Sequence, residues 1–290
     1  FENKCESNLS LEKLITRYNF HLFDDLMRIL LFIIALASVS CTDMFDYSPY
    51  IVDFTPENSS VNARNIELLK GQTPDDTITI AVTGDTHRAY DETASFVDFV
   101  SGMSRIDLVI HTGDYSDFGL PKQYEWINNI LLRLKSPYFV AVGNHDLVGN
   151  GSYAYEKMFG EMNFSFIYST VKFIFINTNS REYKFNGLVP DIKWLGNELE
   201  PDNEFGKAVV VFHTPPFDED FDSSLETEFH TMIDMNDNVL FTLHGHSHRH
   251  EIALPYQDSI PYINTYGVQQ QSIYIIQISN DEFKIETVVF

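Results

Sequence analysis

Short runs of apolar residues recur along the middle of the chain, and each is rich in valine, isoleucine or leucine. They cover residues 78–82, 108–110, 139–142, 209–212 and 239–243. Runs of this length without polar alternation are typical of strands that are buried on both faces of a sheet. Helical spacing fills the gaps between the first three runs, at roughly 91–103 and 121–134, with Trp126 and Ile127 expected to face inward. This alternation predicts an α/β fold.

The pattern changes in the last part of the chain. After His250 the apolar runs are separated by short turns and cover residues 251–254, 261–264, 272–276 and 283–289. Short strands with close turns favour antiparallel hairpins, and we expect these strands on a second sheet. Residues 163–177, with Lys172 near the turn, are expected to form one more hairpin.

A polar motif follows each of the five apolar runs in the middle of the chain. The motifs cover residues 84–87 (GDTH), 113–117 (GDYSD), 143–146 (GNHD), 213–216 (HTPP) and 245–248 (GHSH). Ligands of open α/β sheets bind outside the carboxyl ends of the strands, so we expect the motifs to converge on one rim. The glycine that opens four of them fits a tight turn with close backbone approach. Carboxylate and imidazole groups suit divalent cations, and several strand ends together can hold two.

Composition excludes one class of function. The chain has 290 residues and a net charge of −23, which argues against general nucleic-acid binding because phosphate contacts need lysine and arginine. A pair of bound cations could still attract one phosphate group locally. The partner we expect is therefore a small phosphate ester.

The N-terminal part resembles a bacterial lipoprotein signal segment. Residues 27–41 contain a basic start at Arg28, a short apolar run and small residues before Cys41. The apolar run is far shorter than the ~20 residues that span a bilayer, so we expect a lipid on Cys41 and a place in the bacterial cell envelope. Ser38 stands where such segments usually carry leucine. Ordinary secretory cleavage and a buried apolar helix are the alternatives.

The same segment divides the chain. Residues 1–26 precede Met27, a good candidate for a start codon, and are expected to be an upstream extension. Cys41 would then be the only cysteine, so neither a disulfide framework nor a thiolate metal site is expected. Residues 42–76 are expected to be a tether that runs into an edge strand and a short helix, and residues 77–290 the functional domain.

The five motifs, taken in order, resemble the calcineurin-like metallophosphoesterase superfamily. The pattern of that family is Asp-x-His, Gly-Asp-x-x-Asp, Gly-Asn-His-Asp or Glu, His, and Gly-His-x-His. Here it extends from Asp85 to His248. Any one motif alone could be a helix cap, a core histidine or a loop. The complete set implies the fold of the family, a four-layer αββα sandwich of two mixed sheets flanked by helices.

The resemblance also implies a centre for two divalent ions. Asp114 would bridge the ions, since a carboxylate has two oxygens. Oxygen and nitrogen ligands without sulfur suit manganese, iron, zinc or nickel, and affinity order alone does not choose among them. Manganese is the favoured metal. A hydroxide shared by the ions would attack phosphorus in line. The first ion would be held by Asp85, His87 and His248. The second would be held by Asn144, His213 and His246, and Asp114 would be the bridge.

Three further side chains beside these ligands are candidates for chemistry. His145 is expected to assist the leaving group rather than bind metal, with Asp146 orienting it. Arg88 and Arg249 each follow a predicted ligand and are candidate phosphate contacts.

Departures from the pattern of particular relatives narrow the class. Protein serine/threonine phosphatases have Arg-Gly after the second motif and glutamate in the third, where this chain has Phe118-Gly119 and Asp146. Purple acid phosphatases have tyrosine at the position of Asp117. Thr214 stands where phosphodiesterase members often have a second histidine, which leaves cyclic-nucleotide specificity open.

These features predict a metal-dependent phosphoesterase that hydrolyses a phosphomonoester or a phosphodiester. The alternative is a non-catalytic scaffold of the same fold in an envelope assembly. Scaffolds usually lose ligands or the catalytic histidine, whereas every position is filled here. The motifs select neither the substrate nor the oligomeric state.

Overall fold

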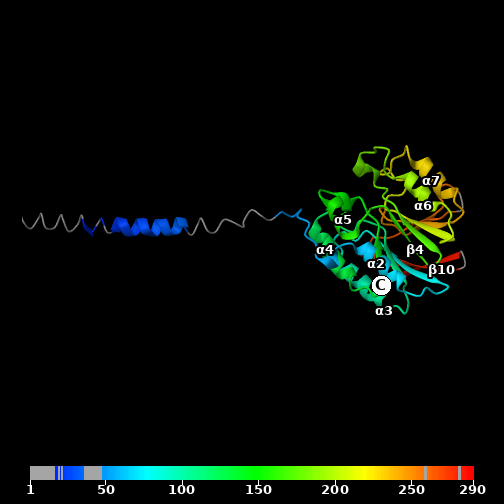
Figure 1. The fold of residues 1–290 in the computed structure, drawn as a ribbon, viewed down its shortest axis with the longest axis horizontal. Helices are drawn as coiled ribbons and strands as arrows, with labels where there is room; N and C mark the ends of the chain where they lie inside the picture. The colour runs from blue at the N-terminus through cyan, green and yellow to red at the C-terminus, as the bar shows by residue number, and fades with distance from the viewer. Residues whose placement is uncertain (1–16, 19, 21, 36–47, 258–259, 280–281) are drawn as a thin grey trace, which may run out of the picture. The chain divides into compact units, whose positions relative to one another are not determined.

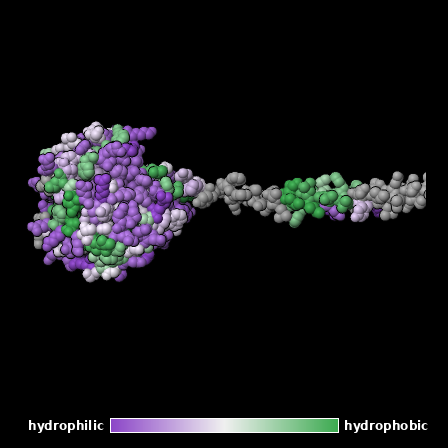
Figure 2. Space-filling model, turned by 180° about the vertical axis from the view of Figure 1, so that it is seen from behind, coloured by the Kyte–Doolittle hydropathy of each residue, from purple (hydrophilic) through white to green (hydrophobic). Residues whose placement is uncertain are grey.

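The computed structural model describes residues 17, 18, 20, 22–35, 48–257, 260–279 and 282–290. The chain forms two units, Phe1–Ser48 and Pro49–Phe290. In the first unit residues 22–35 are helical, and Figure 2 shows a hydrophobic stretch along them. None of the described helices is long and apolar enough to cross a membrane. Cys41 and most of residues 1–26 lie outside the described residues.

The second unit contains two mixed β-sheets (Figure 1). The first has the strand order β11-β10-β1-β2-β3 and the second β4-β5-β6-β7-β9-β8. The strands of the first sheet are β1 (Ile78–Thr83), β2 (Leu108–His111), β3 (Tyr138–Val140), β10 (Ser272–Ser279) and β11 (Glu282–Val289). Those of the second are β4 (Phe164–Tyr168), β5 (Val171–Phe175), β6 (Lys207–Val211), β7 (Val239–His244), β8 (Glu251–Ala253) and β9 (Tyr262–Asn264).

Helices cover the outer face of each sheet, and the two inner faces pack on each other. Phe173, Val209 and Ile276 belong to the apolar layer between the sheets. One outer layer contains α2 (Val61–Lys70), α3 (Tyr90–Gly102), α4 (Pro121–Leu131) and α5 (Gly151–Phe159), and the other α6 (Ile192–Leu199) and α7 (Glu226–Asp234). In Figure 1, α6 and α7 lie on the opposite side of the strands from α3 and α4. The predicted αββα sandwich is therefore confirmed.

The predicted hairpins form, but one of them is in the other sheet. Antiparallel β10 and β11 join the first sheet, where Ile276 of β10 faces Ile80 of β1. The placement follows from β10, which is buried on both faces over most of its length and so suits an interior position beside β1. In the second sheet β9 pairs parallel with β7 and antiparallel with β8. The predicted hairpin within residues 163–177 is confirmed as β4–β5.

Two smaller expectations are wrong. Trp126 is 52% exposed, because the inward face of α4 consists of Tyr124, Ile127, Asn128 and Leu131. Between residues 49 and 76 the structure contains α2 and a 3-10 turn at Pro56–Asn58. The described part of that segment contains the expected short helix and no edge strand.

Candidate metal centre

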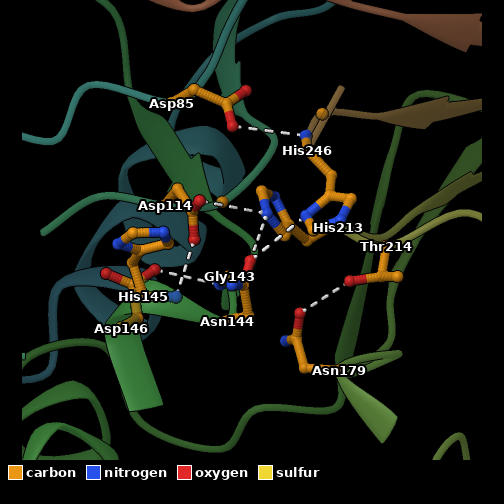
Figure 3. A network of polar contacts seen from close by, with 12 residues as sticks. Asp85, Asp114, Gly143, Asn144, His145, Asp146, Asn179, His213, Thr214 and His246 are labelled. Atoms are coloured by element: carbon orange, nitrogen blue, oxygen red, sulfur yellow. Dashed lines mark hydrogen bonds and ion pairs between the residues drawn. The ribbon is translucent and has the colours of Figure 1, made fainter. Parts of the chain in front are cut away.

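The five motifs meet where the two sheets come together. Asp85, Asp114 and Asn144 follow β1, β2 and β3 of the first sheet, whereas His213 and His246 follow β6 and β7 of the second. Figure 3 shows the two sets facing each other. The expected convergence occurs, but the rim belongs to two sheets rather than one.

The predicted ligands of the first ion lie close together. Nε2 of His248 is 3.2 Å from Oδ1 of Asp85, and Nε2 of His87 is 3.6 Å from Oδ2 of Asp114. One ligand atom from each of Asp85, His87 and His248 can be chosen so that all lie within 4.8 Å of one another. These side chains can thus surround a single cation.

The predicted ligands of the second ion gather around an amide oxygen. Oδ1 of Asn144 is 3.1 Å from Nε2 of His213 and 3.2 Å from Nδ1 of His246. Oδ2 of Asp114 lies 3.3 Å from Nε2 of His213 as well as near His87. Asp114 therefore stands between the two groups, where a bridging carboxylate is needed.

The backbone at this rim adopts an unusual conformation. Five of the predicted ligands have positive φ angles: Asp85 at 46°, His87 at 46°, Asp114 at 54°, His246 at 72° and His248 at 52°. A residue other than glycine in this region costs of order 1–3 kcal/mol. Such strain concentrates at functional sites, where the surrounding structure holds it in place.

Two glycines allow the motifs to approach each other. A Cβ at Gly143 would collide with the backbone amide and the carboxylate of Asp114, and one at Gly245 would lie 2.6 Å from Oδ2 of Asp85. The close backbone approach expected from the sequence is confirmed at both positions.

Charge in the centre is arranged around Asp114. Burial alone would raise the pKa of Asp114, but His213 and His87 hold it well below its usual range. Burial would lower the pKa of His213, yet the Asp114 carboxylate raises it to about 10. Oδ2 of the fully buried Asp85 has no hydrogen-bond partner among the described residues. Divalent cations would replace the imidazolium proton and satisfy this oxygen, so the residues fit the implied metals.

A second layer of contacts orients the histidines. Nδ1–H of His213 donates to the backbone oxygen of Thr112 over 2.9 Å, which leaves its Nε2 lone pair for a metal. The buried His111 accepts from the Gly113 amide and contacts the Thr86 hydroxyl. It thereby links the loops that follow β1 and β2.

His145 occupies the edge of the centre. Its amide donates to Oδ1 of Asp114 over 2.9 Å, and its Nδ1 lies 2.9 Å from the backbone oxygen of Asp117. The side chain is 41% exposed. With Nδ1 engaged by Asp117, Nε2 is the nitrogen that can exchange a proton with a bound substrate.

Asp146, which was expected to orient His145, makes its carboxylate contacts with backbone amides. Its buried carboxylate accepts hydrogen bonds from the amides of Tyr115, Ser116 and Gly143, and burial raises its pKa to about 6 although these amides donate to it. The carboxylate beside His145 belongs instead to Asp117, whose Oδ1 is 3.5 Å from Nδ1. The second Asp of the GDYSD motif was the available sequence signal for this role.

The two candidate arginines differ. Nε of Arg88 is 2.7 Å from Oδ2 of Asp117, and its guanidinium lies 5.6 Å from the centre of the Phe118 ring. Arg88 is therefore tied to the same carboxylate that neighbours His145. Arg249 is exposed beside His248.

The two packed sheets, with carboxylate, amide and imidazole groups gathered at their rim, define a class of protein, the metal-dependent phosphoesterases. The chain belongs to the calcineurin-like phosphoesterase family, whose model matches residues 78–250.

Relatives named as phosphodiesterases align with part of the chain. A 3′,5′-cyclic-nucleotide phosphodiesterase of Nostoc sp. is 28% identical over 160 residues, which are 50% of this chain and 56% of the relative. A probable cyclic nucleotide phosphodiesterase of Coxiella burnetii is 25% identical over 59% of this chain and 71% of its own. The chain thus spans only slightly more than half of the Nostoc relative.

Solved structures share the fold at low sequence identity. Purple acid phosphatase from yellow lupin has a TM-score of 0.60 and 12% identity, covering 76% of this chain and 52% of that one. A dimetal phosphatase from Danio rerio has a TM-score of 0.59 and 11% identity, and the match covers 73% of this chain and 99% of that one.

Proposed function

We propose that the protein is a metal-dependent phosphoesterase that hydrolyses a small phosphomonoester or phosphodiester. The observation that carries the proposal is the convergence of all seven predicted ligands from five strand ends, with Oδ2 of Asp114 between His87 and His213. The relatives named as cyclic-nucleotide phosphodiesterases support hydrolysis of phosphate esters.

Two divalent ions, when bound, supply Lewis acidity and an activated water for in-line displacement at phosphorus. Asp85, His87 and His248 would hold one and Asn144, His213 and His246 the other, with Asp114 shared. His145 stands at the edge of this cluster, where an imidazolium can protonate the leaving oxygen. Oδ1 of Asp117 lies 3.5 Å from Nδ1 of this imidazole. Arg88, with Nε held by Asp117, is the candidate contact for a phosphate oxygen.

The residue at position 214 bears on the class of ester. The Thr214 hydroxyl donates to Oδ1 of Asn179 over 3.1 Å, and both side chains are buried. The Thr214 hydroxyl is therefore engaged by another side chain of the protein (Figure 3). The proposed substrates thus include both monoesters and diesters.

Hydrolysis of p-nitrophenyl phosphate and bis-p-nitrophenyl phosphate with added manganese tests the proposal. We expect Asp114→Ala to lower kcat/KM by about 1000-fold or more, since a shared ligand supports several kcal/mol of charge stabilisation. His145→Ala should lower it by about 100-fold to 10,000-fold. Asp98→Ala, which changes an acidic side chain that is 68% exposed, should have no effect.

Activity on neither ester, or activity that survives both changes, contradicts the proposal. The scaffold alternative requires metal binding without turnover of any phosphate ester. Metal analysis of protein purified without chelators identifies the ions, and we expect two divalent ions per chain, with manganese favoured.

We also propose attachment to the bacterial envelope through a lipid on Cys41. The exposed apolar side chains of residues 22–35, including Ile29, Leu30 and Phe32, support contact with an apolar phase. Cys41→Ser should release the protein from the membrane fraction. If this variant still sediments with membranes, the result counts against a lipid on Cys41 as the anchor.

A further inference from the structure

The second ring nitrogen of His246 faces two carboxylates. Nδ1 of His246 points at Oδ1 of Asn144, and the backbone amide donates to Oδ1 of Asp85 over 3.2 Å. On the other side of the ring, Nε2 lies 3.4 Å from Oδ1 of Asp218 and 3.6 Å from Oδ2 of Asp220. Neither aspartate belongs to the five motifs. Both come from the loop after β6, which also carries the predicted ligand His213.

That loop holds Asp218 in place. The Asp218 amide donates to the backbone oxygen of Pro215 over 3.0 Å, and the Phe221 amide donates to the backbone oxygen of Asp218 over 3.1 Å. Phe221 is 2% exposed in the outer core of the second sheet. The loop is therefore fixed at both ends, by the turn at Pro215 and by a buried ring.

The two carboxylates differ in what else they bind. Asp220 forms an ion pair with the Arg181 guanidinium, and its backbone oxygen accepts from the Arg181 amide over 3.2 Å. Oδ1 of Asp218 also accepts from the Asp220 amide over 2.9 Å. Because Arg181 neutralises Asp220, Asp218 is the stronger acceptor for a proton on Nε2 of His246.

Imidazole chemistry makes this contact consequential. A histidine that binds a metal through Nδ1 carries its proton on Nε2, and an acceptor for that proton fixes the tautomer and the ring orientation. His213 uses the opposite arrangement, since its Nδ1–H is held by Thr112 and its Nε2 faces the centre. The two histidines of the second ion thus present different nitrogens, and each has its own acceptor.

We propose that Asp218 is a positioning residue that sets the affinity of the second ion by holding Nε2–H of His246. The inference rests on the proposed function, because it requires an ion among Asn144, His213 and His246. Asp218 does not touch that ion. Its carboxylate acts through the imidazole, and Asp220 assists it.

Equilibrium dialysis of the full chain against buffered Mn²⁺ alone, with the bound metal counted, tests the proposal. We expect Asp218→Ala to weaken the second ion by about 10-fold to 100-fold, the usual effect of removing the partner of a ligating histidine. The first ion should keep its affinity. Asp218→Asn should restore part of the loss, because the amide oxygen still accepts the hydrogen bond. Glu219→Ala is the matched control, since it removes one negative charge from the same loop at a side chain that is 89% exposed.

A double variant separates positioning from simple attraction of cations. In a His246→Ala background, Asp218→Ala should cause no further loss of Mn²⁺ affinity. An equal loss in both backgrounds overturns the proposal, as does unchanged binding in Asp218→Ala. A third ion that Asp218→Ala removes while two others stay also overturns it. Wild-type protein that binds no Mn²⁺ overturns the proposal and counts against the proposed function, whereas two ions bound to Asp218→Ala with wild-type affinity overturn only the role of Asp218.

Discussion

The apolar layer between the two sheets and the rim that holds the predicted ligands differ in backbone conformation and in hydrogen bonding. In the layer, Phe173 and Val209 are fully buried, and their backbones pair in the regular ladder of β5 and β6. At the rim, backbone conformations are strained and Oδ2 of the buried Asp85 is without a hydrogen bond among the described residues. The difference indicates that burial in the layer stabilises the fold, and that this stability offsets the backbone strain of the rim that holds the predicted metal ligands.

The largest effect should come from the interior layer. Phe173→Ala removes a fully buried ring that lies 5.2 Å from the ring of Phe166, and should lower the free energy of unfolding by about 3–5 kcal/mol. Urea unfolding measures this loss. The fraction that remains folded should keep its kcat, because Phe173 does not reach the rim.

Trp126→Ala is the matched control for that change. This side chain is 52% exposed, so the free energy of unfolding should change by less than about 1 kcal/mol. A small effect of Phe173→Ala, or a loss of kcat in its folded fraction, would break the division between layer and rim.

Asp146 sharpens the comparison, because it lies at the rim but its carboxylate accepts hydrogen bonds from backbone amides. Asp146→Ala leaves the buried amides of Tyr115, Ser116 and Gly143 without their acceptor. An unsatisfied buried donor costs about 1–3 kcal/mol, and relaxation offsets part of the sum, so we expect a loss of about 3 kcal/mol in urea unfolding. If stability is unchanged while kcat falls, Asp146 has the catalytic role that its contacts argue against.

The sequence was sufficient to predict that the candidate ligands converge and insufficient to predict the contacts that support them. Asp85, Asp114 and His213 could be predicted because metal ligands are restricted to a few side-chain types at strand ends. The choice between Asp117 and Asp146 could not, because both belong to the five motifs and only tertiary structure shows which carboxylate approaches His145. Asp218 belongs to no motif, so nothing in the pattern marked it.

The fold shows the same limit. The apolar runs identified the strands, since burial on both faces leaves a clear signal. They did not identify the partner of each strand, and β10 was therefore expected in the wrong sheet. Helical spacing also placed Trp126 inward, although Tyr124 and Asn128 occupy that face of α4.

Asp117 should show the reverse of Asp146. Asp117→Ala removes the carboxylate 3.5 Å from Nδ1 of His145 and leaves the backbone contact intact, so we expect kcat to fall by about 10-fold to 100-fold. The free energy of unfolding should change by less than about 1 kcal/mol. In a His145→Ala background the same change should have little further effect on kcat. An undiminished effect there would assign Asp117 to another group, such as Arg88.

The smallest expected effect is a change in the pH dependence of stability at Tyr274, a buried residue of the first sheet. Burial raises the pKa of Tyr274 to about 12, whereas an unfolded chain ionises its tyrosines near pH 10. The stability that this neutral phenol contributes is fully present below pH 10 and is lost as the pH rises toward 12. Between pH 9 and pH 11 the free energy of unfolding of Tyr274→Phe should therefore fall by about 1 kcal/mol less than that of wild type. Urea unfolding at both pH values measures this difference. Tyr153→Phe, at a side chain that is 47% exposed, should follow the wild-type curve. Equal alkaline losses in wild type and Tyr274→Phe would show that the interior near β10 admits the charged phenolate, and the contrast between a dry layer and a polar rim would then fail at that strand.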